Sequence, residues 1–339
     1  MLASLRRRWE LLSHQHCKPS NWVSILRIDL ILDSLHGVRK TAQGIGLVAA
    51  GAMLIGCSTT TAPSSQRKPI VAAAFYPIED IVRAVDGQAV DIVTLVPPGQ
   101  EAHEYEPSAQ QVGDLQAATV VFYLGGGFQP DVEKAVQSLP ASVRKVDLLK
   151  SVDLLPITGQ LAGTDGEIEA EVLANGADPH VWLDPANMII MATAVADALD
   201  VDASAYIGQL HTLDDAFRTG LAHCRSHVIV TSHRAFEYLA HAYGLTQIPI
   251  AGVSPTEEPS AKTLETVAKA AKANAVTTIF FEHNLPADLA KTVADEVGAT
   301  TAVLDPLESL SRDQLKAGGT YISVMSENLA TLRTGLGCT

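Results

Sequence analysis

Four side chains that can bind a metal ion lie far apart in this chain, most of them just beyond an apolar run typical of a β-strand. They are His103, His180, His233 and Asp305, and the gaps between them are 77, 53 and 72 residues. Gaps of this length exclude a zinc finger or a single binding loop, in which the ligands lie close together in sequence. Only a folded pair of α/β domains could bring all four to one point. Three imidazoles and one carboxylate would then suit zinc.

From Pro69 onward, apolar strand-like runs alternate with helical patterns, which predicts parallel sheets with crossover helices. Three of the candidates follow predicted strands: His103 after residues 89–96, His233 after residues 228–230, and Asp305 at the end of residues 300–304. Ligands of open parallel sheets bind beyond the carboxyl ends of the strands. We therefore expect these three side chains in a cleft, while His180 belongs to a loop.

The predicted elements divide the chain into two lobes of similar plan. We expect a first α/β lobe at residues 69–202 and a second α/β lobe at residues 224–339. A long helical pattern at residues 203–223 lies midway along the fold. This pattern is predicted to be a connector helix between the lobes.

The first 56 residues differ in character from the rest of the chain. They contain seven Lys/Arg and three acidic residues, and Arg39-Lys40 precedes an uncharged apolar stretch at residues 44–56 that is too short to span a bilayer. This pattern predicts a lipoprotein signal peptide that ends before a lipidated Cys57; the start of a buried helix is the alternative. We place the real start at Val38, because a signal peptide usually begins near the start of its chain.

A lipidated Cys57 predicts an exported protein that is anchored to the outer face of the cell membrane. Residues 57–68 are rich in Ser, Thr and Pro and are predicted to form a tether. Cys224 and Cys338 are then an even pair in an exported chain, where disulfides persist. We expect a bridge between them; two free thiols are the alternative.

Composition and motifs exclude several classes of function. Charged residues make up 18% of the chain and the net charge is −14, so the basic face of a nucleic-acid-binding protein is lacking. The sequence also lacks the HExxH, GxSxG and Walker motifs. Four protein ligands would fill a tetrahedral zinc site and leave no position for a catalytic water, which favours a carrier over a zinc hydrolase.

Three further residues near the candidates could take part in the site. His283, beside Glu282 at the end of a predicted strand, competes as a ligand. Glu101 lies close to His103 in sequence and is expected to be structural or an outer partner of that imidazole. We therefore assign Glu101, Glu282 and His283 to the surroundings of the site, as outer partners or alternative ligands.

Four sequence motifs around the candidates occur in order along the chain. They are PPGQEAHEYEPS, ADPHVWLDP, TSHRAFEYLAHAYGL and FFEHNLPADLAKTVADEVGATTAVLDPL. Together they resemble the metal-binding lipoproteins of bacterial ABC importers, the ZnuA/TroA-like solute-binding proteins also called cluster A-I. The resemblance covers about Pro69 to Leu336, and the pair Cys224 and Cys338 resembles an AztC-like, actinobacterial-type zinc subgroup.

This resemblance implies two α/β lobes joined by one rigid helix, with the metal ion in the cleft between them. The family's four ligand positions fall on His103 and His180 in the first lobe and on His233 and Asp305 in the second. The third position is usually glutamate in manganese and iron members and histidine in zinc members. His233 therefore favours zinc, in agreement with the preference of a borderline ion for imidazole.

The resemblance also implies a function. The protein would capture one Zn²⁺ ion per chain and deliver it, as a monomer, to an ABC permease and its ATPase subunit. A carrier of Mn²⁺ or another divalent metal and a surface adhesin are the alternatives. Many zinc members carry a His-rich loop before the second ligand, whereas the matching residues 163–175 hold Asp165, Glu167, Glu169 and Glu171 but no histidine. We expect this segment to be a solvated acidic loop.

Overall fold

The computed structural model describes residues 67–157, 176–256, 258–283 and 287–339, which belong to one compact unit. Several features predicted from the sequence lie outside these residues. They are the leader with Val38 and Cys57, most of the tether, and the acidic loop at residues 163–175.

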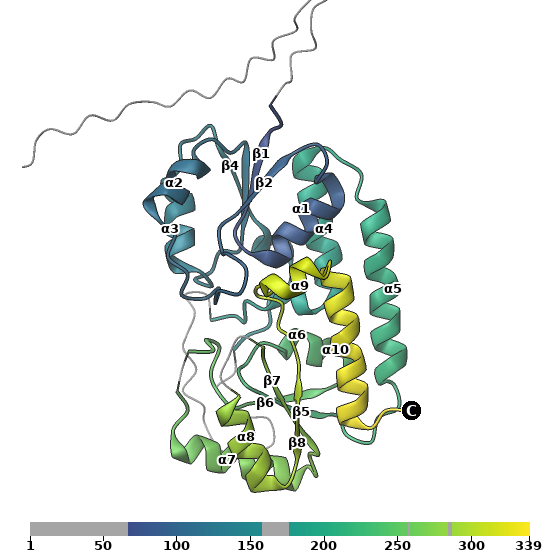
Figure 1. Cartoon of the computed structure of the whole chain (residues 1–339). Coiled ribbons are helices and arrows are strands. Elements are labelled where there is room, and N and C mark those ends of the chain that lie inside the picture. The colour runs from purple at the N-terminus through teal and green to yellow at the C-terminus, as the bar shows by residue number, and fades with distance from the viewer. Residues whose placement is uncertain (1–66, 158–175, 257, 284–286) are drawn as a thin grey trace, which may run out of the picture. The chain divides into compact units, whose positions relative to one another are not determined.

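Two four-stranded parallel sheets form the framework of this unit (Figure 1). The first contains β1 (Ile70–Ala73), β2 (Asp91–Thr94), β3 (Val120–Tyr123) and β4 (Arg144–Asp147), in the order β2-β1-β3-β4. The second contains β5 (Val228–Thr231), β6 (Thr246–Pro249), β7 (Thr278–Phe281) and β8 (Thr300–Val303), in the order β6-β5-β7-β8. The two sheets share one plan, and the predicted pair of parallel α/β lobes is confirmed.

Helices connect the strands and cover the sheets. In chain order they are α1 (Tyr76–Asp86), α2 (Ala109–Leu115), α3 (Pro130–Ser138), 3₁₀ helices η1 (Leu148–Ser151) and η2 (Val181–Leu183), α4 (Pro185–Leu199), α5 (Ser204–Leu221), α6 (Glu237–Tyr243), α7 (Ala261–Ala273), α8 (Asp288–Val297), α9 (Arg312–Lys316) and α10 (Tyr321–Leu336). Local sequence sets many of their ends. Asp184 caps α4 by accepting a hydrogen bond from the Ala186 N–H, and Pro185 suits the first helical position.

Two long helices, α5 and α10, run side by side along one side of both sheets (Figure 1). Helix α5 coincides with the predicted connector pattern. Near its start Tyr206 donates a hydrogen bond to Asp80 of α1, and the chain beyond its end leads into β5. Helix α10 starts beside the same Asp80, which accepts from the Tyr321 N–H, and ends with Gly335 against Phe280 of β7. Each sheet is therefore held to the same pair of helices.

A disulfide joins Cys224, just after α5, to Cys338, just after α10. The bridge closes a sequence separation of 114 residues. It fastens the end of the chain to the segment that enters the second sheet, as predicted for an exported protein.

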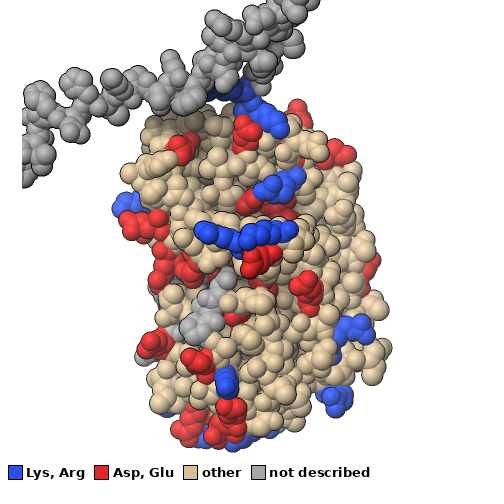
Figure 2. Space-filling view, viewed as in Figure 1, with Lys and Arg blue, Asp and Glu red and all other residues tan. Residues whose placement is uncertain are grey.

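The surface of the described unit carries charges of both signs. In Figure 2 acidic and basic side chains are interspersed on the visible face, with no continuous basic patch there. Among the described residues, no helix combines the length and the apolar character that crossing a membrane would require.

The disulfide generates a prediction about stability. Replacing both Cys224 and Cys338 by serine should lower the free energy of unfolding by about 4–5 kcal/mol. A bridge across so long a loop strongly reduces the conformational entropy of the unfolded chain, and the variant regains that entropy. Urea unfolding of the double variant and of the reduced wild-type protein should give the same lowered midpoint. Equal midpoints for oxidised and reduced wild-type protein would contradict the prediction.

Candidate metal centre

Four buried residues bring ligand-type atoms to one point. His103, His180, His233 and Glu308 each offer an atom within 4.8 Å of all the others. His103 Nε2 lies 3.2 Å from His180 Nε2, and Glu308 Oε1 lies 3.5, 3.5 and 3.2 Å from the Nε2 atoms of His103, His180 and His233. Four ligand atoms about 2.0–2.1 Å from a tetrahedral zinc ion would be about 3.3–3.4 Å apart. The spacing of the cluster therefore fits one such ion.

His103 comes from the loop that follows β2. The Glu101 carboxylate accepts hydrogen bonds from the backbone N–H groups of His103, at 2.6 Å, and Glu104, at 3.0 Å. Glu101 thus shapes the turn that carries His103, which is the structural role expected for it. Both of these hydrogen bonds are to the backbone and not to the imidazole. The His103 ring lies edge-on to Phe128, with centroids 4.7 Å apart.

His180 stands at the start of η2, and Asp178 orients it. Asp178 Oδ1 lies 2.9 Å from the backbone N of His180 and 2.8 Å from its Nδ1. This contact leaves Nε2 of His180 free to face the cluster. Asp178 is held in turn, because the Tyr238 hydroxyl on α6 donates to its carbonyl oxygen at 2.9 Å.

His233 lies two residues beyond β5, in the second sheet. Its Nδ1 lies 2.5 Å from Glu282 Oε1, and Glu282 directly follows β7, the neighbour of β5 in the sheet. The pair therefore forms at the point where the strand order reverses, the usual binding position in such sheets. A carboxylate behind a metal-binding imidazole fixes its tautomer and raises its basicity, which corresponds to the first of the two roles expected for Glu282, outer partner or alternative ligand.

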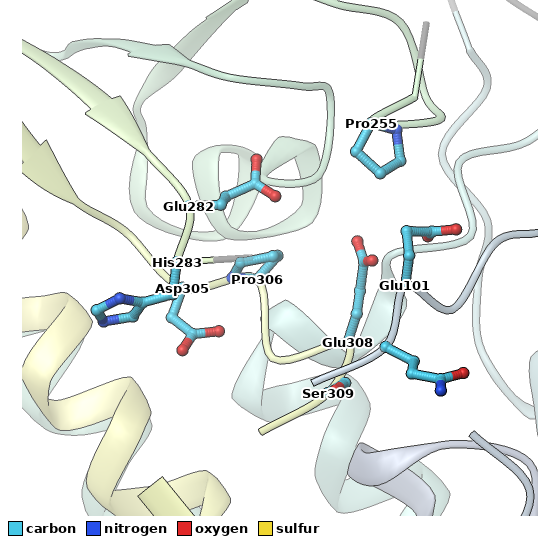
Figure 3. Close-up of a pocket in the computed structure, with 9 residues that line it drawn as sticks. Glu101, Pro255, Glu282, His283, Asp305, Pro306, Glu308 and Ser309 are labelled. Atoms are coloured by element: carbon cyan, nitrogen blue, oxygen red, sulfur yellow. The ribbon is translucent and has the colours of Figure 1, made fainter. Parts of the chain in front are cut away.

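The fourth member of the cluster is Glu308 rather than the predicted Asp305. Asp305 Oδ1 accepts from the Leu307 N–H and its Oδ2 accepts from the Gln314 side chain, each at 2.8 Å. The short Asp305 side chain is thus used to close a turn, and the turn presents Glu308 to the histidines. Figure 3 shows the Asp305 carboxylate turned away from that of Glu308.

Sequence reasoning missed Glu308 although it lies three residues beyond Asp305. The available signal was the Asp-Pro pair, which favours a turn and places a residue beyond it in the cleft. The competing candidate His283 is exposed and lies outside the cluster. In Figure 3 its ring lies beside Asp305, at a distance from Glu308.

A small pocket adjoins the cluster, lined by residues of both lobes (Figure 3). Glu308 is the one member of the cluster on its lining, where Glu101, Glu282 and Asp305 also occur. The carboxylates give this pocket a negative character, which suits the approach of a cation.

Burial and neighbouring charges shift the pKa values of the residues in the cluster. Burial alone would lower the pKa values of His180 and His233, but Asp178 raises the pKa of His180 and Glu282 raises the pKa of His233 to about 10. Burial would likewise raise the pKa of Glu308, yet the imidazoles, His103 above all, hold it well below its usual range. Asp178 and Glu282 thus favour the protonated forms of His180 and His233, whose charge helps to balance the buried carboxylate.

Two atoms of the cluster indicate that a cation could balance the charge of Glu308. His233 Nε2 and Glu308 Oε1 are buried and have no hydrogen-bonding partner of normal geometry. Buried polar atoms without partners are costly and call for an explanation. A metal ion bound by three imidazoles and one carboxylate would satisfy both atoms at once.

Comparisons with known proteins point to the same chemistry. The chain matches the family described as "Zinc-uptake complex component A periplasmic" over residues 71–335. It is 36% identical over 293 residues to the "Zinc-binding lipoprotein AdcA" of Streptococcus pneumoniae (strain ATCC BAA-255 / R6), with 83% of this chain and 58% of that protein covered. The chain thus spans a little more than half the length of this relative.

A second relative and a solved structure are matched over nearly their full length. The "High-affinity zinc uptake system protein ZnuA" of Bacillus subtilis (strain 168) is 31% identical over 319 residues, with 88% of this chain and 98% of that protein covered. The crystal structure of the Zn(II)-bound ZnuA-like domain of Streptococcus pneumoniae AdcA has 35% sequence identity and a TM-score of 0.66. It covers 79% of this chain and 99% of that domain.

The geometry assigns different roles to the two neighbouring carboxylates, and a pair of isosteric variants separates them. Glu308→Gln removes a charged ligand and should weaken zinc binding at least about 100-fold, since leaving buried imidazoles without their carboxylate is costly. Asp305→Asn keeps an oxygen that can accept from the Leu307 N–H, so its affinity should stay within about tenfold of wild type. Competition titration with a zinc chelator measures both, and the reverse order of effects would restore Asp305 as the ligand.

The raised histidine pKa values predict how zinc binding depends on pH. At pH 7 the His233 ring, with a pKa of about 10, holds a proton that zinc must displace. Affinity should therefore rise with pH between 6 and 8, by about tenfold per pH unit for each proton released. Calorimetry in two buffers of different ionisation enthalpy counts those protons. A binding enthalpy independent of the buffer would contradict this electrostatic picture.

Proposed function

This chain belongs to the family of zinc-uptake complex component A, and we propose that it is the zinc-binding protein of a bacterial importer. It captures one Zn²⁺ ion outside the cytoplasm and delivers the ion to a membrane permease. The observation that carries the proposal is the buried cluster of three imidazoles and one carboxylate, whose ligand atoms all lie within 4.8 Å of one another.

We assign the four zinc ligands to His103, His180, His233 and Glu308. Each imidazole would bind through Nε2, the atom that faces the cluster. Asp178 and Glu282 support two of the rings from behind, as outer carboxylates do in zinc proteins. Three nitrogen ligands favour zinc over manganese, which prefers oxygen.

A carrier fits this site better than an enzyme. Catalytic zinc usually keeps one position for water or substrate, whereas four protein ligands complete a tetrahedral shell. The ligands also come from both lobes, with His103 and His180 before α5 and His233 and Glu308 after it. A small separation of the lobes would therefore break the shell and release the ion.

The position of the protein in the cell follows from the same proposal. Lipidation of Cys57 would anchor the exported chain to the outer face of the membrane, next to the permease. The permease and its ATPase subunit are the expected partners, and the protein itself would act as a monomer. The disulfide between Cys224 and Cys338 agrees with an oxidising location.

Zinc titration of His233→Ala tests the proposal. Wild-type protein should bind one zinc ion per chain tightly, and the variant should lose at least about 100-fold in affinity, because it leaves Glu282 and Glu308 buried beside an absent ring. His283→Ala is the matched control, since His283 is exposed beside the same pocket and lies outside the cluster.

The possible outcomes test the position of the site and the choice of metal separately. Unchanged zinc binding by His233→Ala would refute the proposed site, and a loss in His283→Ala would move the site toward the pocket mouth. Wild-type protein that binds manganese more tightly than zinc would leave a metal carrier but overturn the choice of metal.

A further inference from the structure

The turn that carries Glu308 contains a disfavoured backbone conformation. Leu307 has a φ of +55°, in the left-handed region that residues with a Cβ rarely adopt, and its side chain is fully buried. Such a conformation persists only where the surrounding structure holds it. The contacts of residues 305–309 therefore decide whether Glu308 stays beside the histidines.

Helix α10, which contacts both lobes, holds the turn at its beginning. Asn328 of α10 binds both backbone groups of Asp305: its Oδ1 accepts from the Asp305 N–H at 2.9 Å, and its Nδ2 donates to the carbonyl oxygen at 2.7 Å. The Asp305 side chain in turn accepts from the Leu307 N–H. These contacts fasten one end of the turn to α10.

The first lobe holds the turn at two points: the Gly99 N–H donates to Ser309 Oγ at 2.7 Å at its far end, and the indole of Trp182 holds its middle. Trp182 Nε1 donates a hydrogen bond of 2.7 Å to the carbonyl oxygen of Pro306, immediately before Leu307. Trp182 is fully buried and lies two residues beyond His180. The carbonyl oxygen of Trp182 accepts from the Tyr321 hydroxyl at 2.6 Å, which fixes its backbone. The indole hydrogen bond thus ties the backbone of the Glu308 turn to the segment of His180.

We propose that Trp182 is a positioning residue, whose indole N–H latches the strained Glu308 turn in its metal-binding conformation and slows zinc release. The proposal rests on the proposed function of the cluster. The latch forms only while the η2 segment lies against Pro306, so it stabilises the arrangement in which all four ligands meet. When the segments part, the conformation at Leu307 is less well held and Glu308 can withdraw from the ion.

The variant Trp182→Phe tests the latch, because it keeps an aromatic ring and removes the N–H donor. It leaves the buried Pro306 oxygen unpaired in the zinc-bound arrangement, so zinc release to excess chelator should be about tenfold faster. Tyr206→Phe is the matched control. It removes a buried hydrogen bond of 2.8 Å, to Asp80, between α5 and α1, and leaves the hydrogen bonds of Trp182 and of residues 305–309 in place.

Both variants should lower the thermal midpoint by similar amounts, but only Trp182→Phe should accelerate zinc release. If Trp182→Phe loses stability and releases zinc at the wild-type rate, the indole is merely structural and the proposal is wrong. Failure of the wild-type protein to bind zinc at all would refute the proposed function itself, and the latch with it.

A measurement on unaltered protein covers the case in which Trp182→Phe does not fold. Trp182 is the one tryptophan of residues 57–339, the proposed mature chain, so its indole N–H signal is assigned without any further variant. Its hydrogen exchange should be at least about tenfold slower with zinc bound than without, since the latch is coupled to the bound arrangement. Equal exchange rates in the two states would overturn the proposal.

Discussion

One buried carboxylate among three imidazoles organises this protein. Glu308 Oε1 lies 3.2–3.5 Å from three ring nitrogens, in surroundings where an unpaired charge would be costly. Protons on the rings, or one divalent cation, can balance it. Because two of the imidazoles belong to one lobe and the third belongs with Glu308 to the other, this balance is also an attraction between the lobes. The binding site and the closed arrangement of the fold thus depend on the same charges.

The surrounding structure works to keep these four side chains oriented. Parallel strands bring His233 and Glu282 together at the reversal of strand order in the second sheet. Asp178 fixes His180, and Glu101 shapes the backbone of the His103 turn. Helix α10 and the indole of Trp182 hold the turn of Glu308 at two different points. Preorganisation of this kind favours one coordination geometry over others and so contributes to the choice of metal.

Sequence reasoning reached the fold class and three of the four residues of the cluster, for identifiable reasons. Strand-end positions follow from the alternation of apolar strand patterns with helical patterns, so the sequence alone predicts His103 and His233 in a cleft. The fourth residue depends on a turn whose course no periodic pattern encodes. Asp305 resembled a ligand, yet its oxygens close the backbone at Leu307, which adopts a conformation unusual for leucine.

X-ray absorption at the zinc edge, on protein loaded with one equivalent of zinc, tests the central claim most directly. The account predicts four nitrogen or oxygen neighbours at about 2.0–2.1 Å, with the multiple-scattering signature of three imidazoles and no sulfur. Loss of one oxygen neighbour in Glu308→Gln, with the imidazole signature retained, would identify the carboxylate. A shell of five or six oxygen-rich neighbours, or a signature of fewer than three imidazoles in the wild-type protein, would contradict it.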